Sequence, residues 1–194
     1  NFTRNAIYDL STTSTNPTVS GITLAGGTTN NVSNNLIGDL RSTANTAAVG
    51  LAGILVSSGT TNNIFHNTVN LNATGGTTFG SSGIYFSSST PLNNFRNNII
   101  VNTSTPGSTS GITAAIRYVT APTSTNFPAA NNNNLYFVGT AAANIVLYAD
   151  NTTSANNQQT IAGYKTYINT TLAVAGREAG SVSENPSFTS TAGS

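Results

Sequence analysis

Gly53-Ile54-Leu55-Val56, followed after five residues by Asn62-Asn63-Ile64-Phe65-His66-Asn67-Thr68-Val69, is the stretch of this 194-residue chain that decides its fold. Its template is Gly-Ile-x-apolar, then Asn-Asn-apolar-x-x-Asn-x-apolar, and it recurs along most of the sequence. The last asparagine of the template returns at intervals of 30, 32, 31 and 36 residues, at Asn5, Asn35, Asn67, Asn98 and Asn134. A nearly fixed period of this length indicates a solenoid, in which each repeat forms one coil.

The glycine that opens the template marks the other half of each repeat and falls at Gly21, Gly53, Gly83 and Gly111. The distance from this glycine to the next template asparagine is 14, 14 and 15 residues in the first three copies, but 23 in the fourth. We therefore expect a constant half made of strands and a variable half made of loops that line one edge. The fourth coil is expected to carry an insertion of about nine residues within 117–128.

Apolar residues alternate within the constant half, as they do in a strand with one buried face. The aligned copies give three apolar columns: Ile22, Ile54 and Ile84; Val32, Ile64 and Phe95; and Ile7, Ile37, Val69 and Ile100. No 3.6-residue period is present, and Thr, Ser and Asn are poor helix formers, which disfavours a helical solenoid. The expected fold is all-β, a right-handed parallel β-helix solenoid of about five coils with three short strands in each.

Two columns of asparagine predict structural ladders along the solenoid axis. Side-chain amides stacked at the strand spacing of about 4.8 Å can hydrogen-bond from coil to coil, and asparagine tolerates tight bends between strands. The expected ladder residues are Asn5, Asn35, Asn67 and Asn98 in one column, and Asn31, Asn63 and Asn94, continuing from Asn1, in the other. A ligand-binding role for these asparagines is the less favoured interpretation.

The pattern changes near residue 150. We expect β-helix coils over residues 1–149 and a C-terminal cap of the same domain over residues 150–194, because natural solenoids cover their ends. Residues 161–168 are expected to form a short helix with Thr160 as its N-cap. The chain starts at Asn1 inside a repeat and without Met, which suggests a processed or fragmentary chain.

The composition argues against several classes of function. Charged residues make up 6% of the chain and the net charge is +1, with no basic stripe, so nucleic-acid binding is not expected. No apolar run reaches the length of a membrane span. The absence of cysteine rules out disulfides and thiolate metal sites, and no other spacing predicts a metal site or a cofactor.

Residues able to perform acid–base chemistry are scarce. Glycoside cleavage needs paired carboxylates, and the acidic residues are only Asp9, Asp39, Asp150, Glu178 and Glu184. Asp9 and Asp39 share a coil position on adjacent coils, so they are candidates for an acid–base pair or a cation site, although a structural role is favoured. His66 is the only histidine, and it shares its column with Arg4, Asn34 and Asn97 as an expected exposed polar position. No nucleophile elbow or phosphate loop is present, so no catalytic residue is expected.

The insertion in the fourth coil is the candidate for a binding element, because it joins aromatic residues to a cation. Packing of this loop over the coil is the favoured interpretation. The alternative is contact with a carbohydrate or a partner, through Tyr85, Arg117, Tyr118 and Phe127. A threonine pair also repeats at Thr28-Thr29 and Thr60-Thr61, but the next copy reads Pro91-Leu92, so an ordered array of the ice-binding kind is too short.

The repeat Gly-Ile-x-apolar followed by Asn-Asn-apolar-x-x-Asn-x-Ile resembles that of right-handed parallel β-helix proteins, the pectate-lyase-like superfold. The tail, TIAGYKTYI at 160–168 and SVSENPSF at 181–188, is similar to the C-terminal end of secreted β-helix proteins of Bacteroidota. In those proteins a short helix is followed by an Asn/Asp-Pro-x-Phe strand. The resemblance covers nearly the whole chain and implies the fold. It leaves the function open, because this fold is shared by lyases, hydrolases, adhesins and fibres.

These features favour a secreted or cell-surface protein that is structural or adhesive rather than catalytic. The edge of the first coil, with the apolar Phe2 and Ile7, is expected to dock a like subunit, which would give a homo-oligomer or a fibre. A carbohydrate-binding or polysaccharide-degrading β-helix domain is the alternative, and an ice- or surface-binding protein is the third hypothesis.

Overall fold

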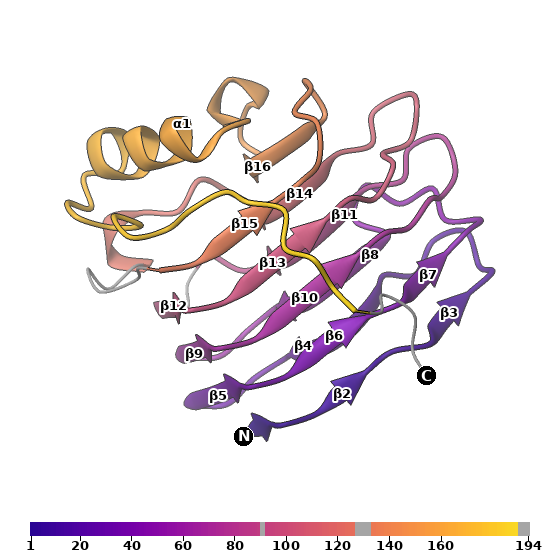
Figure 1. The fold of residues 1–194 in the computed structure, drawn as a ribbon, viewed down its shortest axis with the longest axis horizontal. Coiled ribbons are helices and arrows are strands. Elements are labelled where there is room, and N and C mark those ends of the chain that lie inside the picture. Colours follow the sequence, from indigo (N-terminus) through magenta and orange to yellow (C-terminus); the bar gives the residue numbers. More distant parts are fainter. Residues whose placement is uncertain (90–91, 127–132, 190–194) are drawn as a thin grey trace.

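The computed structural model is a parallel β-solenoid of about four turns, and it describes residues 1–89, 92–126 and 133–189. The coils stack along one axis, with the N-terminus at one end and helix α1 at the other (Figure 1). All pairings between the named strands are parallel. This arrangement confirms the all-β solenoid expected from the repeat.

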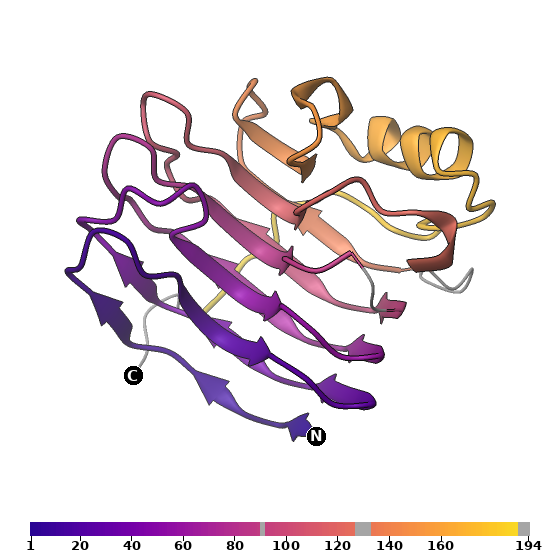
Figure 2. The same ribbon diagram turned by 180° about the vertical axis from the view of Figure 1, so that it is seen from behind.

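Three sheets run along the solenoid, one for each strand of the repeat. The first sheet contains β1 (Phe2–Thr3), β5 (Thr29–Ser33), β9 (Thr61–Phe65) and β12 (Leu92–Arg96). The second sheet contains β2 (Ala6–Ile7), β6 (Leu36–Gly38), β10 (Thr68–Leu71), β13 (Ile99–Asn102) and β15 (Leu135–Phe137). The third sheet, seen from outside in Figure 2, contains β4 (Val19–Leu24), β8 (Leu51–Val56), β11 (Ser81–Phe86), β14 (Thr113–Tyr118) and β16 (Ile145–Asp150). A short fourth sheet pairs β3 (Leu10–Thr12) with β7 (Leu40–Ser42).

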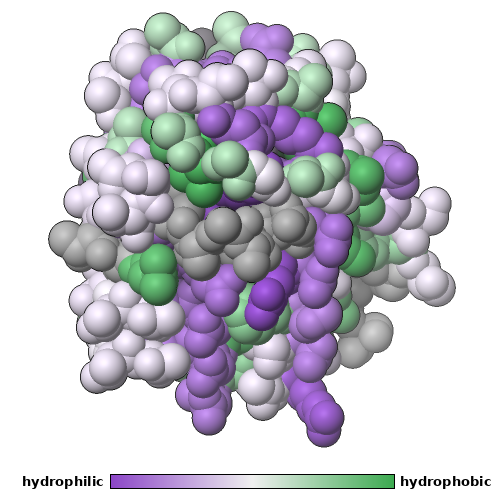
Figure 3. Space-filling view, turned by 90° about the vertical axis from the view of Figure 1, so that its left-hand side faces the viewer, coloured by the Kyte–Doolittle hydropathy of each residue, from purple (hydrophilic) through white to green (hydrophobic). Residues whose placement is uncertain are grey.

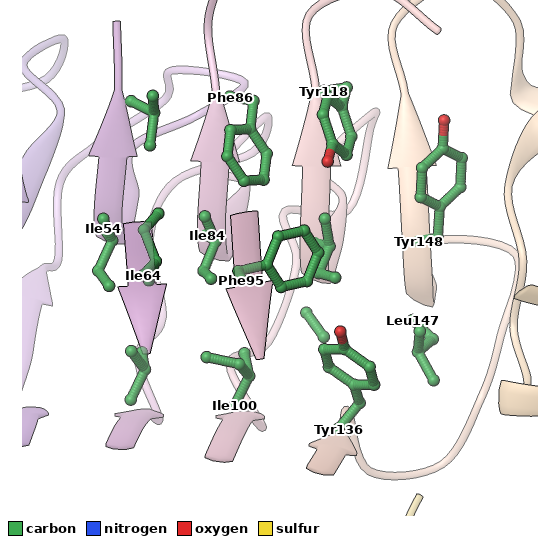
Figure 4. Close-up of a cluster of buried hydrophobic side chains, with 14 of the residues drawn as sticks. Ile54, Ile64, Ile84, Phe86, Phe95, Ile100, Tyr118, Tyr136, Leu147 and Tyr148 are labelled. Atoms are coloured by element: carbon green, nitrogen blue, oxygen red, sulfur yellow. The ribbon is translucent and has the colours of Figure 1, made fainter. Parts of the chain in front are cut away.

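The core is a stack of apolar side chains that all three sheets contribute. The expected columns are confirmed, because Ile54 pairs in register with Ile22 and Ile84, Ile64 pairs with Val32 and Phe95, and these six residues are buried. The third column is also in register, and it is buried except for Ile7, which is partly exposed. The side chains become larger toward the C-terminal end, where aromatic rings replace aliphatic groups (Figure 4). Val56, Phe86 and Tyr118 occupy one position on successive coils, and the rings of Phe86 and Tyr118 stack with centroids 4.5 Å apart.

The bend between the first and second sheets explains one column of polar residues. The residue before each ladder asparagine has a positive φ of 56–64°, at Arg4, Asn34, His66, Asn97 and Asn133. This left-handed conformation suits asparagine better than most other non-glycine residues. His66 is therefore one member of a column of bend residues, and its position is explained by the backbone conformation of the bend.

The register of the fourth coil differs from the expectation that Gly111 continues the glycine column. Ile84 pairs with Ile116, so Ala115 occupies on the fourth coil the position that Gly83 occupies on the third. Glycine fits this column because an added Cβ on Gly53 would lie 2.3 Å from Cγ1 of Val69. Gly111 instead lies in the preceding loop, where an added Cβ would meet the Phe79 carbonyl oxygen at 2.0 Å.

The insertion in the fourth coil is consequently shorter than expected. The distance from Ala115 to the ladder residue Asn134 is 19 residues, against 15 from Gly83 to Asn98, so the excess is four residues rather than nine. The fourth-coil segment contains a short 3-10 turn, η1 (Ser124–Asn126). Residues 113–118 are therefore strand β14 and not part of a loop.

Beyond β16 the chain packs over the last coil. It forms the turn η2 (Ser154–Asn156), helix α1 (Ile161–Thr166) and the π turn η3 (Tyr167–Thr171). Thr160 is the N-cap as expected, since its Oγ1 accepts a hydrogen bond of 3.1 Å from the Gly163 amide. The ring of Tyr164 stacks on Tyr148 of β16 with centroids 5.3 Å apart, so the helix extends the aromatic core.

The last described residues run as an extended tail across the second sheet (Figure 1). A single parallel bridge joins Val182 to Leu135. The expected strand containing Pro186 and Phe188 is not formed within residues 133–189, where this segment is irregular.

Candidate functional site

The outer side of the first sheet carries a regular array of side chains, five polar and one aromatic. We call it the amide face, and its residues are Asn31, Ser33, Asn63, Phe65, Asn94 and Arg96. Its asparagines form the outer ladder predicted from the sequence. Nδ2 of Asn31 donates to Oδ1 of Asn1 at 2.9 Å, Asn63 donates likewise to Asn31 at 2.9 Å, and Asn94 donates to Asn63 at 3.3 Å. Seen from this side, the surface shows hydrophilic columns along the solenoid axis (Figure 3).

A second column of the amide face brings an aromatic ring under a cation. Ser33, Phe65 and Arg96 are in register on β5, β9 and β12. The guanidinium carbon of Arg96 lies 4.6 Å from the centroid of the half-buried Phe65 ring. A flat sheet that combines an aromatic ring, a guanidinium and amides offers stacking together with hydrogen-bond donors and acceptors.

The inner asparagine ladder is buried from Asn35 to Asn134, and its hydrogen bonds all run in one direction. Both the backbone N–H and Nδ2 of Asn5 donate to Oδ1 of Asn35, at 3.0 and 2.8 Å. Asn35 donates in the same way to Asn67, Asn67 to Asn98, and Asn98 to Asn134. Every step therefore runs from one coil to the next toward the C-terminus, which confirms the predicted ladder and extends it to Asn134.

The ladder ends at a buried group that we call the terminal cluster: Asn134, Tyr136, Arg177, Glu178 and Ser181. Nδ2 of Asn134 donates to Oε2 of Glu178 at 3.2 Å, and its backbone N–H donates to Oγ of Ser181 at 2.9 Å. The hydroxyls of Tyr136 and Ser181 also donate to Oε2 of Glu178, at 3.1 and 2.5 Å. The carboxylate is thus the acceptor that the last ladder amide needs.

The charged groups of the terminal cluster are buried, and one of them lies over an aromatic ring. Arg177 and Glu178 are both completely buried, and Nε of Arg177 lies 3.9 Å from Oε1 of Glu178. The Arg177 guanidinium also lies 4.9 Å from the centroid of the Phe95 ring. Burial raises the pKa of the Glu178 carboxyl above its ordinary value, and Arg177 with the donors Ser181, Asn134 and Tyr136 offsets part of that shift.

The other acidic residues of the coils also make structural contacts. Asp9 and Asp39, considered as an acid–base pair or cation site, are instead bridged by Arg41, which donates to both carboxylates, to Asp39 at 2.7 Å. Oδ2 of Asp150 accepts from the Tyr148 hydroxyl at 3.0 Å, and its Oδ1 accepts from the Thr152 amide at 2.9 Å.

The residues expected at a binding loop do not form a shared surface. Tyr118 points into the core and is 2% exposed, because strand alternation turns it inward. Its neighbour Arg117 points outward but is buried, since it donates to the Ala48 carbonyl at 2.6 Å and to Oδ1 of Asn151. Tyr85 is half-buried beside Arg117 on the third sheet. Phe127 lies outside the described residues.

His66 and the other candidate ligands are separated from one another. The ring Nε2 of His66 lies 3.5 Å from Nδ2 of Asn97, in the column of bends. Within residues 1–89, 92–126 and 133–189, no three His, Asp or Glu side chains gather as a metal site would require. The helices of the described chain are too short and too polar to cross a membrane.

The loops also form a shallow open groove. It lies between two loops, at residues 74–77 and 105–108, and its lining is glycine, proline, serine and threonine. Such a lining offers hydroxyls and backbone groups but no ionisable side chain.

Comparisons with protein-family models, with curated proteins and with solved structures found no match for this chain. The function is therefore argued from the chain's own geometry. Two parts of that geometry were missed in the sequence. Phe65 and Arg96 share a coil position and alternate with the core residues Ile64 and Phe95, which is a signal that the sequence contains. Glu178 lies outside the repeat, and no sequence signal pairs it with Asn134.

Proposed function

We propose that this chain is a non-catalytic, extracellular protein with a structural or adhesive role. The observation that supports the proposal is that four of its five acidic side chains are engaged in holding the fold together. Asp9 and Asp39 are bridged by Arg41, Asp150 bonds Tyr148, and Glu178 ends the inner ladder. The fifth, Glu184, is exposed in the tail.

Catalysis of polysaccharide cleavage needs at least one carboxyl that is free to exchange a proton with substrate. In Asp9 and Asp39 the carboxylates face a shared guanidinium, and Glu178 is sealed inside the cap. Four of the five carboxyls are therefore occupied by structural contacts, and the fifth, Glu184, lies in the tail. A long polar face without a charge cluster suits a scaffold or a contact surface better than a cleavage site.

The extracellular location is part of the same proposal. It is supported by the resemblance of the repeat and tail to secreted β-helix proteins of Bacteroidota and the pectate-lyase-like superfold, and by a surface of amides and hydroxyls. Detection of the native chain in the culture medium or on the cell surface, rather than in the cytoplasmic fraction, is the expected result. Confinement to the cytoplasmic fraction would contradict this part of the proposal.

A second candidate function, carbohydrate binding, is favoured by the amide face. Phe65 offers a partly exposed ring, Arg96 a guanidinium and Asn63 an amide within two columns of one flat sheet. Sugars bind such surfaces through stacking and hydroxyl hydrogen bonds. This site replaces the one expected around Arg117 and Tyr118, whose side chains are buried.

A fibre of stacked copies is a narrower version of the structural proposal, and the C-terminal end of the solenoid gives it less support. End-to-end stacking would place the C-terminal end of one copy on the first coil of the next. At the C-terminal end, however, the ladder donor Asn134 is already bonded to Glu178 and covered by the cap. Sedimentation of the native chain as a series of oligomers of increasing size would nonetheless favour the fibre.

The test of the main proposal combines turnover and binding measurements on the same purified chain. We expect no cleavage of any glycan in a panel, and no change when Asp9→Asn or Asp39→Asn is introduced. Turnover that either substitution abolishes would overturn the non-catalytic proposal. Retention on a glycan array that Phe65→Ala weakens, while the half-buried Tyr85→Phe does not, would favour the carbohydrate-binding alternative.

A further inference from the structure

The guanidinium of Arg96 on the amide face is held in place without being neutralised. Its carbon lies 4.6 Å from the centroid of the ring of Phe65, the register partner of Arg96 on the preceding coil. Within residues 1–89, 92–126 and 133–189 this guanidinium makes no hydrogen bond and no ion pair. Its N–H donors therefore remain open to a ligand, while the contact with Phe65 restricts the orientation of the side chain.

Most of the other basic side chains have acceptors inside the protein. In the described part of the chain, four of the six basic residues contact such acceptors, and they are Arg41, Arg117, Lys165 and Arg177. The remaining two are Arg96 and Arg4, and Arg4 belongs to the column of bend residues that borders the amide face. The positive charge that the fold does not use for its own contacts is therefore gathered on one side of the solenoid.

No carboxylate opposes this charge on the sheet itself. The five acidic residues of the chain all lie outside strands β5, β9 and β12, and four of them are engaged in holding the fold together. An anionic ligand that approaches the amide face therefore meets positive charge without repulsion from a carboxylate of the same sheet.

The rest of the amide face supplies the contacts that a sugar makes around such a charge. Phe65 points outward because it alternates with the buried Ile64, and its ring is half-buried, so part of the ring can contact a ligand. Asn63 uses one Nδ2 N–H for its bond to Asn31, which leaves the second N–H for a ligand hydroxyl. Figure 3 shows hydrophobic surface between hydrophilic columns on this side of the molecule. A sugar ring, with its apolar face and its hydroxyls, fits both kinds of surface.

We propose that the amide face binds an acidic glycan, in which a sugar ring packs on Phe65 and an anionic group of the same glycan pairs with the guanidinium of Arg96. The chemistry required is a sugar chain that carries carboxylate or sulfate groups, because a guanidinium binds such planar or multidentate anions through several N–H donors at once. The inference rests on the carbohydrate-binding candidate function, and it deepens that function by naming the class of glycan.

The test uses three polymers that share one backbone: dextran, carboxymethyl dextran and dextran sulfate. We expect the full chain to bind at least one of the two charged polymers about tenfold or more tightly than it binds dextran. That affinity should fall as salt is added, since ions screen exposed charge pairs. Arg96→Gln should weaken the binding of the charged polymer by about tenfold and leave the binding of dextran unchanged.

The matched control is Lys165→Gln, which removes the same charge from the cap and should change the affinity by less than about twofold. Both substitutions replace partly exposed side chains, so the fold should persist. Arg96→Lys keeps the charge but loses the planar fork, and it should retain only part of the native affinity. Binding of either charged polymer that depends on Arg96 and not on Lys165 supports the inference, and the polymer that binds more tightly identifies the anionic group.

The opposite results would overturn the inference. They are charged polymers that bind no more tightly than dextran, or equal losses of affinity with Arg96→Gln and Lys165→Gln. Retention on a glycan array that depends on Phe65 would in that case leave the carbohydrate-binding candidate in place, whereas the absence of retention on the array and on all three polymers would remove both.

Discussion

Asn67 shows how one side chain serves both the bend and the stack. Its Oδ1 accepts from the backbone and side chain of Asn35, and its Nδ2 donates to the Val32 carbonyl at 2.9 Å and to Oδ1 of Asn98 at 3.1 Å. The side chain is 1% exposed, so water cannot replace these bonds. An amide is the side-chain group that supplies two donors and an acceptor without charge.

Asn67→Ala is therefore expected to lower the free energy of unfolding by about 2–4 kcal/mol, because the backbone N–H of Asn35 loses its acceptor and Oδ1 of Asn98 loses one of its two donors inside the solenoid. The matched control is Asn63→Ala on the outer ladder, which water can solvate and which should cost less than about 1 kcal/mol. Denaturant unfolding of the three proteins measures both values. Equal costs for the two substitutions would show that the inner ladder is not specially sealed from water.

Ile54 tests the core at the same scale. It is fully buried between Ile22 and Ile84. Ile54→Asp should destabilise the chain by several kcal/mol or prevent folding, since an unpaired carboxylate would be buried. Ile54→Val should cost only about 0.5–1.5 kcal/mol. A thermal midpoint for Ile54→Asp within a few degrees of the native value would refute the register described above.

At the scale of elements, the cap depends on one carboxyl. Glu178 accepts the last ladder bond from Asn134 and lies beside Arg177 in a site from which water is excluded. Its pKa is raised from 4.5 on folding, chiefly by burial. Between pH 4.5 and the raised pKa the folded state therefore binds more protons than the unfolded state.

The consequence is that the free energy of unfolding contributed by Glu178 falls as pH rises above 4.5. The contribution of Glu178 should be fully present below pH 4.5 and be lost as pH increases through its folded pKa. Glu178→Gln removes the titration, so its free energy of unfolding should vary less with pH across that window than the native value does. Glu184→Gln, which removes one exposed carboxyl from the tail, is the matched substitution for comparison. Native and Glu178→Gln curves of equal slope would contradict the account of the terminal cluster.

The strands were predictable because the same pattern of apolar and polar positions recurs in successive coils. The alternation around Ile54 and Ile64, repeated at a fixed spacing, identified the first three coils together with the inner and outer asparagine ladders. The fourth coil was misaligned because Gly111 and Ala115 competed for one position. Glycine is required both by close approach in the column and by the tight loop before β14, so its presence alone did not locate the strand.

The misalignment also explains why the expected binding loop was wrong. Once β14 is known to span Thr113–Tyr118, alternation sends Tyr118 into the core and Arg117 outward. The loop containing Ala48 then covers Arg117, a contact between residues 69 positions apart that no local pattern encodes. The terminal cluster was missed for the same reason, because Glu178 meets Asn134 only after the cap has folded back.

For the whole molecule, the central claim is that a sealed amide ladder, directed from the first coil to Glu178, holds the solenoid together. If this claim holds, the side-chain amide protons of Asn67 and Asn98 are among those that exchange most slowly with solvent, because their exchange requires the coils to separate. Asn72 is exposed in a loop and provides the internal reference.

The measurement is side-chain amide hydrogen exchange by NMR on the native chain. We predict that the Nδ2 protons of Asn67 and Asn98 exchange at least about tenfold more slowly than those of Asn72. Exchange of all three amides at one common rate would contradict a ladder sealed inside the solenoid.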